Sequence, residues 1–159
     1  MDIPVLMAHL PLKLTIIAKK ELFKIPIFGH GMRAFGILEI DRTNRAKAIE
    51  TLNQAAAILK DEKVSILTFP EGTRSTDGQL RSFKKGPFML AINTKIPIVP
   101  ISIKGTFPIL PKGQLKVRPG RVQMTIHPPV ETDTYDINTR NELIDHVHQI
   151  IAEKFYETA

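Results

Sequence analysis

The stretch VSILTFPEGTRS, residues 64–75, joins an apolar run to a charged turn and sets the organisation of the fold. Its first five residues are mostly aliphatic or β-branched, which predicts a buried strand. Pro70 and Gly72 favour a tight turn directly after that strand. Such a turn requires neither Glu71 nor Arg74. Ligands commonly bind beyond strand ends in open α/β sheets, so a solvated turn and a binding site both fit these residues.

Outward from this stretch, apolar strands alternate with amphipathic or capped helices. The patterns predict strands at 14–18, 36–40, 64–69, 98–103 and 122–126 and helices at 2–10, 27–35, 44–59, 86–93 and 140–156. Asp2 and Asn44 are predicted to cap two of these helices, and residues Leu143, Val147, Ile150 and Ile151 to form the buried side of the last one. This alternation predicts an α/β fold with a mixed central sheet flanked by helices.

The overall composition limits the classes of protein to which the sequence can belong. With 159 residues, of which 43% are hydrophobic and 24% charged, the chain is expected to form one globular domain. Its net charge of +6 favours anionic partners such as nucleic acid, phosphate compounds or anionic lipid surfaces. The sequence has no cysteine, which excludes disulfides and thiol nucleophiles within it. No apolar run approaches the ~18 residues of a membrane span.

Cations follow the turn at short spacing. Arg74 offers a planar fork suited to phosphate, and Lys84 and Lys85 come shortly afterwards, before Gly86. Three cations that converge on one loop would form an anion pocket. Further along, Lys112, Lys116, Arg118 and Arg121 form a basic loop without interleaved aromatic residues. That composition suits a lipid surface or an acidic carrier protein better than base stacking.

FPEGTRS, followed by Phe83-Lys84-Lys85-Gly86, resembles the third sequence block of the 1-acylglycerol-3-phosphate acyltransferases, also called lysophosphatidic acid acyltransferases. Two further blocks agree in order and spacing. Residues 36–42, GILEIDR, are similar to the second block, and residues 96–101, IPIVPI, to the fourth. The basic pair Lys19-Lys20 also precedes a P-x-F-G stretch at residues 26–29, as in family members. The resemblance covers most of the chain and implies a glycerol-3-phosphate acyltransferase-like fold.

The first block of the family is a histidine, four residues and an aspartate. The residues after Met1, DIPVLMAHLP, are similar to the stretch that comes after that block in family members, so Asp2 matches the aspartate that orients the histidine base. The histidine position lies five residues before Asp2, outside the 159 residues. The sequence is therefore expected to be a single acyltransferase domain, residues 1–159, that lacks its N-terminal portion through truncation or a misplaced start. In relatives the missing part includes membrane-associated helices.

The resemblance implies transfer of an acyl group from acyl-CoA or acyl-carrier protein to the free hydroxyl of lysophosphatidic acid, without a metal or redox cofactor. The substrate-binding residues it implies are Arg42, Glu71, Gly72, Thr73, Arg74, Lys84 and Lys85. The arginines and lysines would hold the phosphate. Glu71 would accept a hydrogen bond from the acceptor glycerol or hold Arg74. The protein is expected at an anionic membrane surface, on the cytoplasmic face and peripheral in this form.

Two alternatives from other classes stay open. One is a catalytically inactive remnant that binds phosphate or lipid, because none of the five histidines stands at the required spacing to Asp2. For His9, His30, His127, His146 and His148 a structural role is favoured, although His30 has no assigned role. The other is a nucleic-acid-binding domain, which the absence of tryptophan and of tyrosines in basic stretches disfavours. Nucleic acid is therefore not an expected partner.

Overall fold

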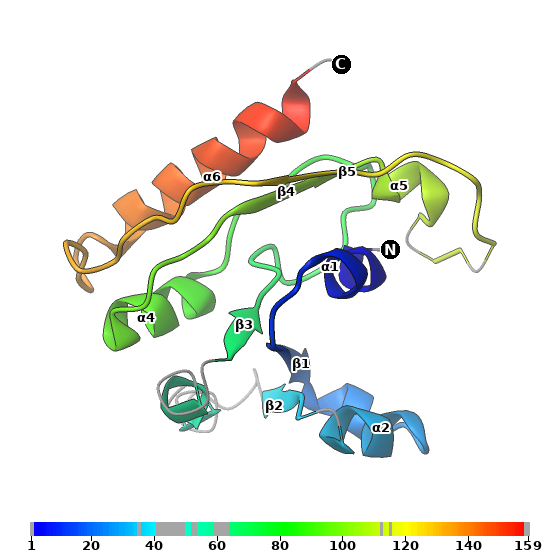
Figure 1. The fold of residues 1–159 in the computed structure, drawn as a ribbon, viewed down its shortest axis with the longest axis horizontal. Helices are drawn as coiled ribbons and strands as arrows, with labels where there is room; N and C mark the ends of the chain where they lie inside the picture. Colours follow the sequence, from blue (N-terminus) through cyan, green and yellow to red (C-terminus); the bar gives the residue numbers. More distant parts are fainter. Residues whose placement is uncertain are drawn as a thin grey trace. The chain divides into compact units, whose positions relative to one another are not determined.

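The computed structural model describes residues 2–34, 36–40, 50–51, 54–58, 64–111, 113–114 and 116–157. The chain forms two compact units (Figure 1). The first consists of Met1–His9 and Phe69–Ala159, and the second of Leu10–Thr68. The expectation of a single domain over residues 1–159 stays a prediction.

The unit Leu10–Thr68 contains a parallel sheet of three strands in the order β2-β1-β3. The central strand β1 (Leu14–Lys19) pairs with β2 (Leu38–Ile40) and with β3 (Ser65–Leu67), with Ile17 opposite Leu38 and Ile16 opposite Leu67. These three strands confirm the predicted ones, with β2 and β3 shorter than expected. Thr15 adds a hydrogen bond from its hydroxyl to the Gly36 carbonyl oxygen, 2.7 Å away.

Helical segments connect the parallel strands, as a crossover requires. Between β1 and β2 lie the 3₁₀ helix η1 (Lys20–Lys24), which was not predicted, and α2 (Phe28–Ala34), which was. Residues 54–58 are helical and lie between β2 and β3 in the chain, within the helix predicted at 44–59. Asn44, the predicted cap of that helix, lies outside the described residues.

The other unit contains three longer helices, α1 (Asp2–His9), α4 (Lys85–Thr94) and α6 (Arg140–Tyr156), each close to its predicted bounds. Its two strands, β4 (Ile101–Lys104) and β5 (Gln123–Ile126), pair antiparallel. A short helix α5 (Thr106–Ile109) lies between the strands predicted at 98–103 and 122–126, where no helix was predicted. With this pair and the parallel sheet, the predicted α/β class is confirmed. None of the helices in the described part of the chain has the length and apolarity needed to cross a membrane.

The strand predicted at 98–103 was expected to be interrupted by its proline, and the structure confirms the interruption. Ile98 forms an isolated bridge with Val130, and regular pairing resumes only at Ile101. Pro100, which lies between them, has no backbone N–H and cannot donate to a ladder. Its carbonyl oxygen still accepts a hydrogen bond from the His127 N–H at 3.0 Å.

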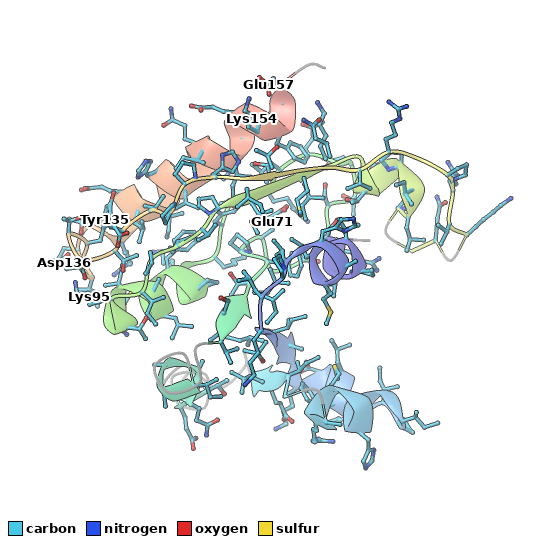
Figure 2. All side chains as sticks on the ribbon, in the orientation of Figure 1. Glu71, Lys95, Tyr135, Asp136, Lys154 and Glu157 are labelled. Carbon is cyan, nitrogen blue, oxygen red and sulfur yellow. The ribbon has the colours of Figure 1, made fainter. Side chains whose placement is uncertain are left out.

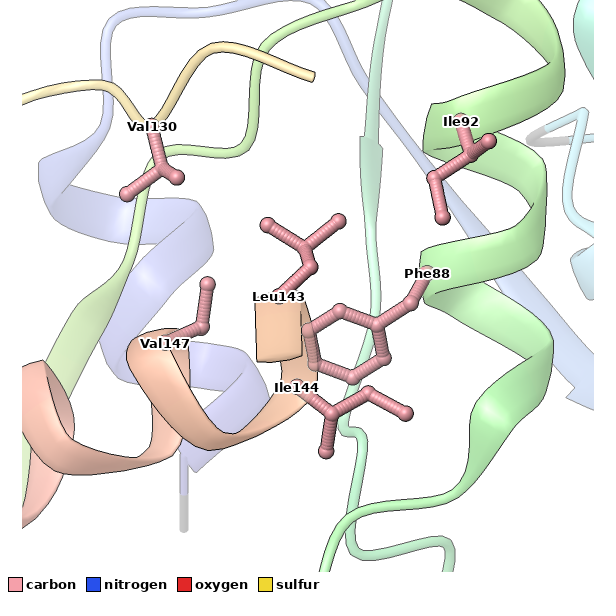
Figure 3. Packing of buried hydrophobic residues seen from close by; sticks show 6 residues of the cluster. All are labelled: Phe88, Ile92, Val130, Leu143, Ile144 and Val147. Carbon is pink, nitrogen blue, oxygen red and sulfur yellow. The ribbon is translucent and has the colours of Figure 1, made fainter. Parts of the chain in front are cut away.

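The core of this unit lies between α4 and α6. Phe88 and Ile92 of α4 pack with Val130 and with Leu143, Ile144 and Val147 of α6 (Figure 3). Leu143 is fully buried, while Ile150 and Ile151 are partly buried against the cluster, so the predicted buried side of α6 is confirmed. Because α4 begins at Lys85, this core also fixes the end of the loop that starts with FPEGTRS.

Candidate functional site

FPEGTRS begins with a four-residue turn. The Gly72 N–H donates to the Phe69 carbonyl oxygen at 3.0 Å, which places Pro70 second and Gly72 fourth in the turn, the positions each residue favours. Gly72 has a φ of 74°, a left-handed conformation that glycine adopts without strain. Glu71 therefore stands at the third position of a shaped turn.

The chain returns to this turn ten residues later. The Arg81 N–H donates to Glu71 Oε2 at 3.1 Å, and the Lys84 N–H donates to the Pro70 carbonyl oxygen at 2.7 Å. Within the loop, Asp77 Oδ1 accepts hydrogen bonds from the Ser75 hydroxyl at 2.6 Å and the Gln79 N–H at 3.0 Å. These bonds bring the backbone of Lys84 beside the turn that carries Glu71.

Glu71, labelled in Figure 2, is half-buried. Burial raises the pKa of its carboxyl above 4.5, and the nearby Asp2 charge adds to the increase. The hydrogen bond from the Arg81 N–H opposes this rise, as do the charges of Arg81 and His148. Burial is the largest of these effects, so the pKa of Glu71 stays above its ordinary value although the Arg81 N–H bond favours the charged form.

Asp2 is the first residue of α1 and lies near Glu71. Its Oδ1 atom is buried and has no hydrogen-bond partner among the described residues. A buried carboxylate oxygen without a partner is costly, so native proteins rarely leave one unpaired. Asp2 therefore has an unused acceptor, which is the atom that a neighbouring imidazole N–H would use.

The cations lie at the surface. Thr73, Arg74, Lys84 and Lys85 are all exposed, and Arg74 makes no hydrogen bond or ion pair within the described part of the chain. No hydrogen bond or ion pair joins Glu71 to Arg74 in the described part of the chain, and the contact that Glu71 makes there is with the Arg81 N–H. Arg42 lies outside the described residues.

Lys84 and Lys85 mark the start of α4. Lys84 is the N-cap, in extended conformation and without a side-chain capping bond, and no acidic residue lies in the first turn. The first N–H groups of a helix have no intrahelical partner, and the helix dipole adds positive potential there. This ten-residue helix therefore begins with two lysines and with the N–H groups of Lys85 and Gly86 directed at its N-terminus, because Pro87 has no N–H and the Lys84 N–H donates to Pro70.

The five histidines occupy separate places. His30 is exposed on α2 in the unit Leu10–Thr68, whereas the other four belong to the unit that contains Asp2 and Glu71. His9 donates from Nδ1 to the Val5 carbonyl oxygen at 2.9 Å, and His146 Nδ1 lies 3.4 Å from the Tyr135 hydroxyl. The His148 ring packs edge-on against Phe83, with ring centroids 4.7 Å apart. Of the five, His148 is the one whose charge acts on Glu71.

A serine–histidine contact that the sequence did not reveal joins β4 to the end of β5. Ser102 Oγ lies 2.8 Å from His127 Nε2 and donates to the Ile151 carbonyl oxygen at 3.1 Å. The serine hydroxyl lies between the His127 ring and the backbone of α6. The contact therefore ties α6 to the strand pair. Among the described residues, no group of three or more histidines, aspartates and glutamates gathers to hold a metal.

The sequence matches the Acyltransferase family model over residues 1–104, which contain every site residue named above except the histidines of the C-terminal part. The chain belongs to the Acyltransferase family. The resemblance predicted from the sequence blocks is thereby confirmed, and the Glu71 turn and the start of α4 lie within the matched part of this acyltransferase-family chain.

Curated relatives of this family member carry more specific names. It is 35% identical over 140 residues to a 1-acyl-sn-glycerol-3-phosphate acyltransferase of Limnanthes alba, which covers 88% of the chain and 50% of the relative. A protein of the same name from Salmonella typhimurium is 36% identical over 89% of the chain and 57% of the relative. The chain thus spans about half the length of the curated relatives it matches.

A solved structure agrees with this assignment. The 1-acyl-sn-glycerophosphate acyltransferase PlsC from Thermotoga maritima is 34% identical and superposes with a TM-score of 0.78. The match covers the whole of this chain and 64% of that one. The fold described above is therefore an acyltransferase fold.

Proposed function

We propose that the protein transfers a fatty acyl group from an acyl thioester to the free hydroxyl of a 1-acylglycerol-3-phosphate. The observation that carries this proposal is the hydrogen-bonded pairing of the Glu71 turn with the start of α4, through Pro70 and Lys84. It places a carboxylate beside a helix N-terminus flanked by two lysines. The names of the relatives support the substrate class.

In this proposal the phosphate of the acceptor lies at the start of α4. The side chains of Lys84 and Lys85 and the N–H groups of Lys85 and Gly86 supply positive charge, and the unpaired guanidinium of Arg74 supplies a bidentate contact. Gly72 and Thr73 carry the backbone between Glu71 and Arg74. Holding the phosphate fixes the distance from the acceptor hydroxyl to the reacting centre.

Glu71 and Asp2 have different roles. With one oxygen bonded to the Arg81 N–H, Glu71 uses its other oxygen to accept a hydrogen bond from the glycerol part of the acceptor. Asp2 uses its unpaired Oδ1 to orient a histidine, whose position in the family pattern is five residues before it.

The chemical step is an acyl transfer. The histidine takes the proton of the acceptor hydroxyl as its oxygen attacks the thioester carbonyl carbon. The new C–O ester bond forms, the C–S bond breaks, and the proton passes to the departing sulfur, which leaves as a thiol. Acyl-CoA or acyl-carrier protein supplies the thioester. No electron is gained or lost, so the step requires no redox cofactor, and the proposal includes no metal.

The direct assay supplies both substrates to the full-length protein and measures phosphatidic acid. Formation of phosphatidic acid from lysophosphatidic acid and an acyl thioester supports the proposal. Transfer to phosphate-free acceptors at the same rate would instead indicate an acyltransferase of another substrate class.

Glu71 gives this activity a defined pH dependence. Because burial raises its pKa, Glu71 takes up a proton at a higher pH than an ordinary glutamate as the solution is acidified. Protonation removes the charged acceptor, so KM for lysophosphatidic acid should rise as the pH falls through a window above 4.5. Glu71→Gln cannot titrate and should lack this component. KM is measured against pH for both proteins. Titration of the acceptor phosphate affects both profiles equally, so the difference between them reports Glu71. Identical profiles would contradict the role of Glu71.

Membrane association is proposed to be peripheral and electrostatic. Lys116, Arg118 and Arg121 are exposed in the segment between α5 and β5, and the net charge of the sequence is +6. Binding to anionic vesicles should weaken as salt rises, and Arg118→Gln should weaken it about fivefold at low salt, since a basic residue near an anionic surface contributes about 1 kcal/mol. Vesicle co-sedimentation measures this. Equal binding to neutral and anionic vesicles at all salt concentrations would refute it.

A further inference from the structure

The C-terminal helix α6 contacts the loop that carries the proposed acceptor site. At its last turn, the Tyr156 hydroxyl oxygen accepts a hydrogen bond from the Leu80 N–H at 3.2 Å. About two turns earlier, the His148 ring packs against Phe83, which also stacks on Phe88 of α4 with ring centroids 6.1 Å apart. The loop segment 80–83 is therefore held at both ends by one helix.

The spacing of the two contacts shows that the segment runs along α6. An α-helix rises 1.5 Å per residue, so the Cα atoms of His148 and Tyr156 are about 12 Å apart along its axis. Three residues of extended chain, from Leu80 to Phe83, span at most about 10 Å. Since Leu80 meets the later helix residue and Phe83 the earlier one, the segment runs opposite to α6.

The end of α6 that carries Tyr156 is itself fixed. Lys104 of β4 donates from Nζ to the Glu157 carbonyl oxygen, and Lys154 Nζ lies 2.8 Å from Glu157 Oε2 (Figure 2). The Phe155 ring packs edge-on against the Tyr156 ring, with centroids 5.1 Å apart. Tyr156 therefore presents its hydroxyl from a turn that is tied to β4.

Between the two contacts lies Arg81, whose N–H donates to Glu71. We propose that Tyr156 and His148 are positioning residues, which hold segment 80–83 against α6 so that the Arg81 N–H meets the Glu71 carboxylate. This inference rests on the proposed function, in which Glu71 binds the acceptor. Both residues lie beyond residues 1–104, the part that matches the family model, so the site depends on a helix outside that part.

The charged groups around Glu71 determine how its pKa would change if segment 80–83 lost its contacts with α6. Asp2 of α1, Arg81 of the loop and His148 of α6 act on the Glu71 carboxyl. If segment 80–83 moves away, the Arg81 N–H bond is lost, and the pKa of Glu71 rises further because that bond stabilises the charged form. The acidic limb of acceptor binding then shifts to higher pH.

The test uses the two tyrosines of the sequence as a matched pair in the full-length protein. Tyr156→Phe removes the hydroxyl that Leu80 contacts, whereas Tyr135→Phe removes a hydroxyl that contacts His146 at the other half of α6. Amide hydrogen exchange at Leu80 and Arg81 is expected to become about fivefold faster in Tyr156→Phe and to stay unchanged in Tyr135→Phe. Unchanged exchange in Tyr156→Phe would overturn the proposal.

Kinetics with lysophosphatidic acid supply the functional readout. Tyr156→Phe should raise KM about fivefold with kcat nearly unchanged, and should shift the acidic limb of its pH profile upward. A fall in kcat at constant KM would overturn the positioning role. If the wild-type protein fails to acylate lysophosphatidic acid, the proposed function falls, while the exchange rates still decide whether α6 holds the loop.

The ring contact between His148 and Phe83 is tested with one variant that keeps an aromatic ring at position 148 and one that removes it. His148→Phe keeps an aromatic ring against Phe83 and should preserve slow exchange at Arg81, whereas His148→Ala removes the ring and should accelerate it several-fold. Equal acceleration in both variants would overturn the ring contact as the means of positioning.

Discussion

Asp2→Asn is expected to lower kcat by about 10²–10⁴-fold in a protein extended so that a histidine stands five residues before Asp2. The buried Oδ1 of Asp2 has no partner among the described residues, and an imidazole N–H would satisfy it. Asparagine keeps the size of the side chain and loses the charge that stabilises the imidazolium. Steady-state acylation of lysophosphatidic acid measures the loss.

Two comparisons separate this role from a structural one. KM for lysophosphatidic acid should stay close to that of the wild type, because the proposed phosphate contacts lie on α4 and at Arg74. Replacing the upstream histidine as well should add little, since members of a base–orienter unit act together. If the 159-residue chain without that histidine turned over within a few-fold of the extended protein, Asp2 would have no orienting role.

Arg74→Ala is expected to raise KM for lysophosphatidic acid at least tenfold. Losing a charge-assisted contact to phosphate costs about 1.5–3 kcal/mol, and 1.4 kcal/mol corresponds to a factor of ten. The exposed guanidinium has no partner in the described part of the chain, so its removal should change the free energy of unfolding by less than about 0.5 kcal/mol. Acceptor saturation curves and thermal unfolding together measure both effects.

Arg74→Lys is expected to have an intermediate effect on KM. It keeps the charge and loses the planar fork, so its KM should lie between those of the wild type and Arg74→Ala. Arg33→Ala is the matched control, because Arg33 is an exposed arginine of α2 that pairs with Glu39 at 3.7 Å. Its KM should be unchanged. An unchanged KM in Arg74→Ala would remove Arg74 from the phosphate site.

Local sequence patterns were sufficient for most of the fold. The helix at 140–156 was predicted at its observed bounds because its apolar residues recur at helical spacing and pack on α4. The turn at Pro70 and Gly72 followed from residue preferences that the hydrogen bond to Phe69 confirms. The short helices η1 and α5 were missed, since each is too short for a periodic pattern to emerge.

The site was only partly predictable, because its contacts join residues far apart in the chain. Leu80 and Tyr156 are separated by 76 residues, and Ser102 and His127 by 25. Such pairs follow from tertiary packing, which no local motif encodes. The hydrogen-bond partner of Glu71 could not be predicted from the sequence either. The sequence allowed Glu71 to pair with Arg74, whereas the return of the chain offers the Arg81 N–H instead.

The most direct test of the phosphate site compares acceptors with and without phosphate. Rates of acylation of 1-acylglycerol-3-phosphate and of 1-acylglycerol would be measured for the full-length wild type and for Arg74→Ala, at one salt concentration. The wild type should favour the phosphate-bearing acceptor in kcat/KM, and Arg74→Ala should reduce that preference at least tenfold by losing only the phosphate-dependent part. A preference of the same size in both proteins would contradict the assignment of the FPEGTRS turn to acceptor binding.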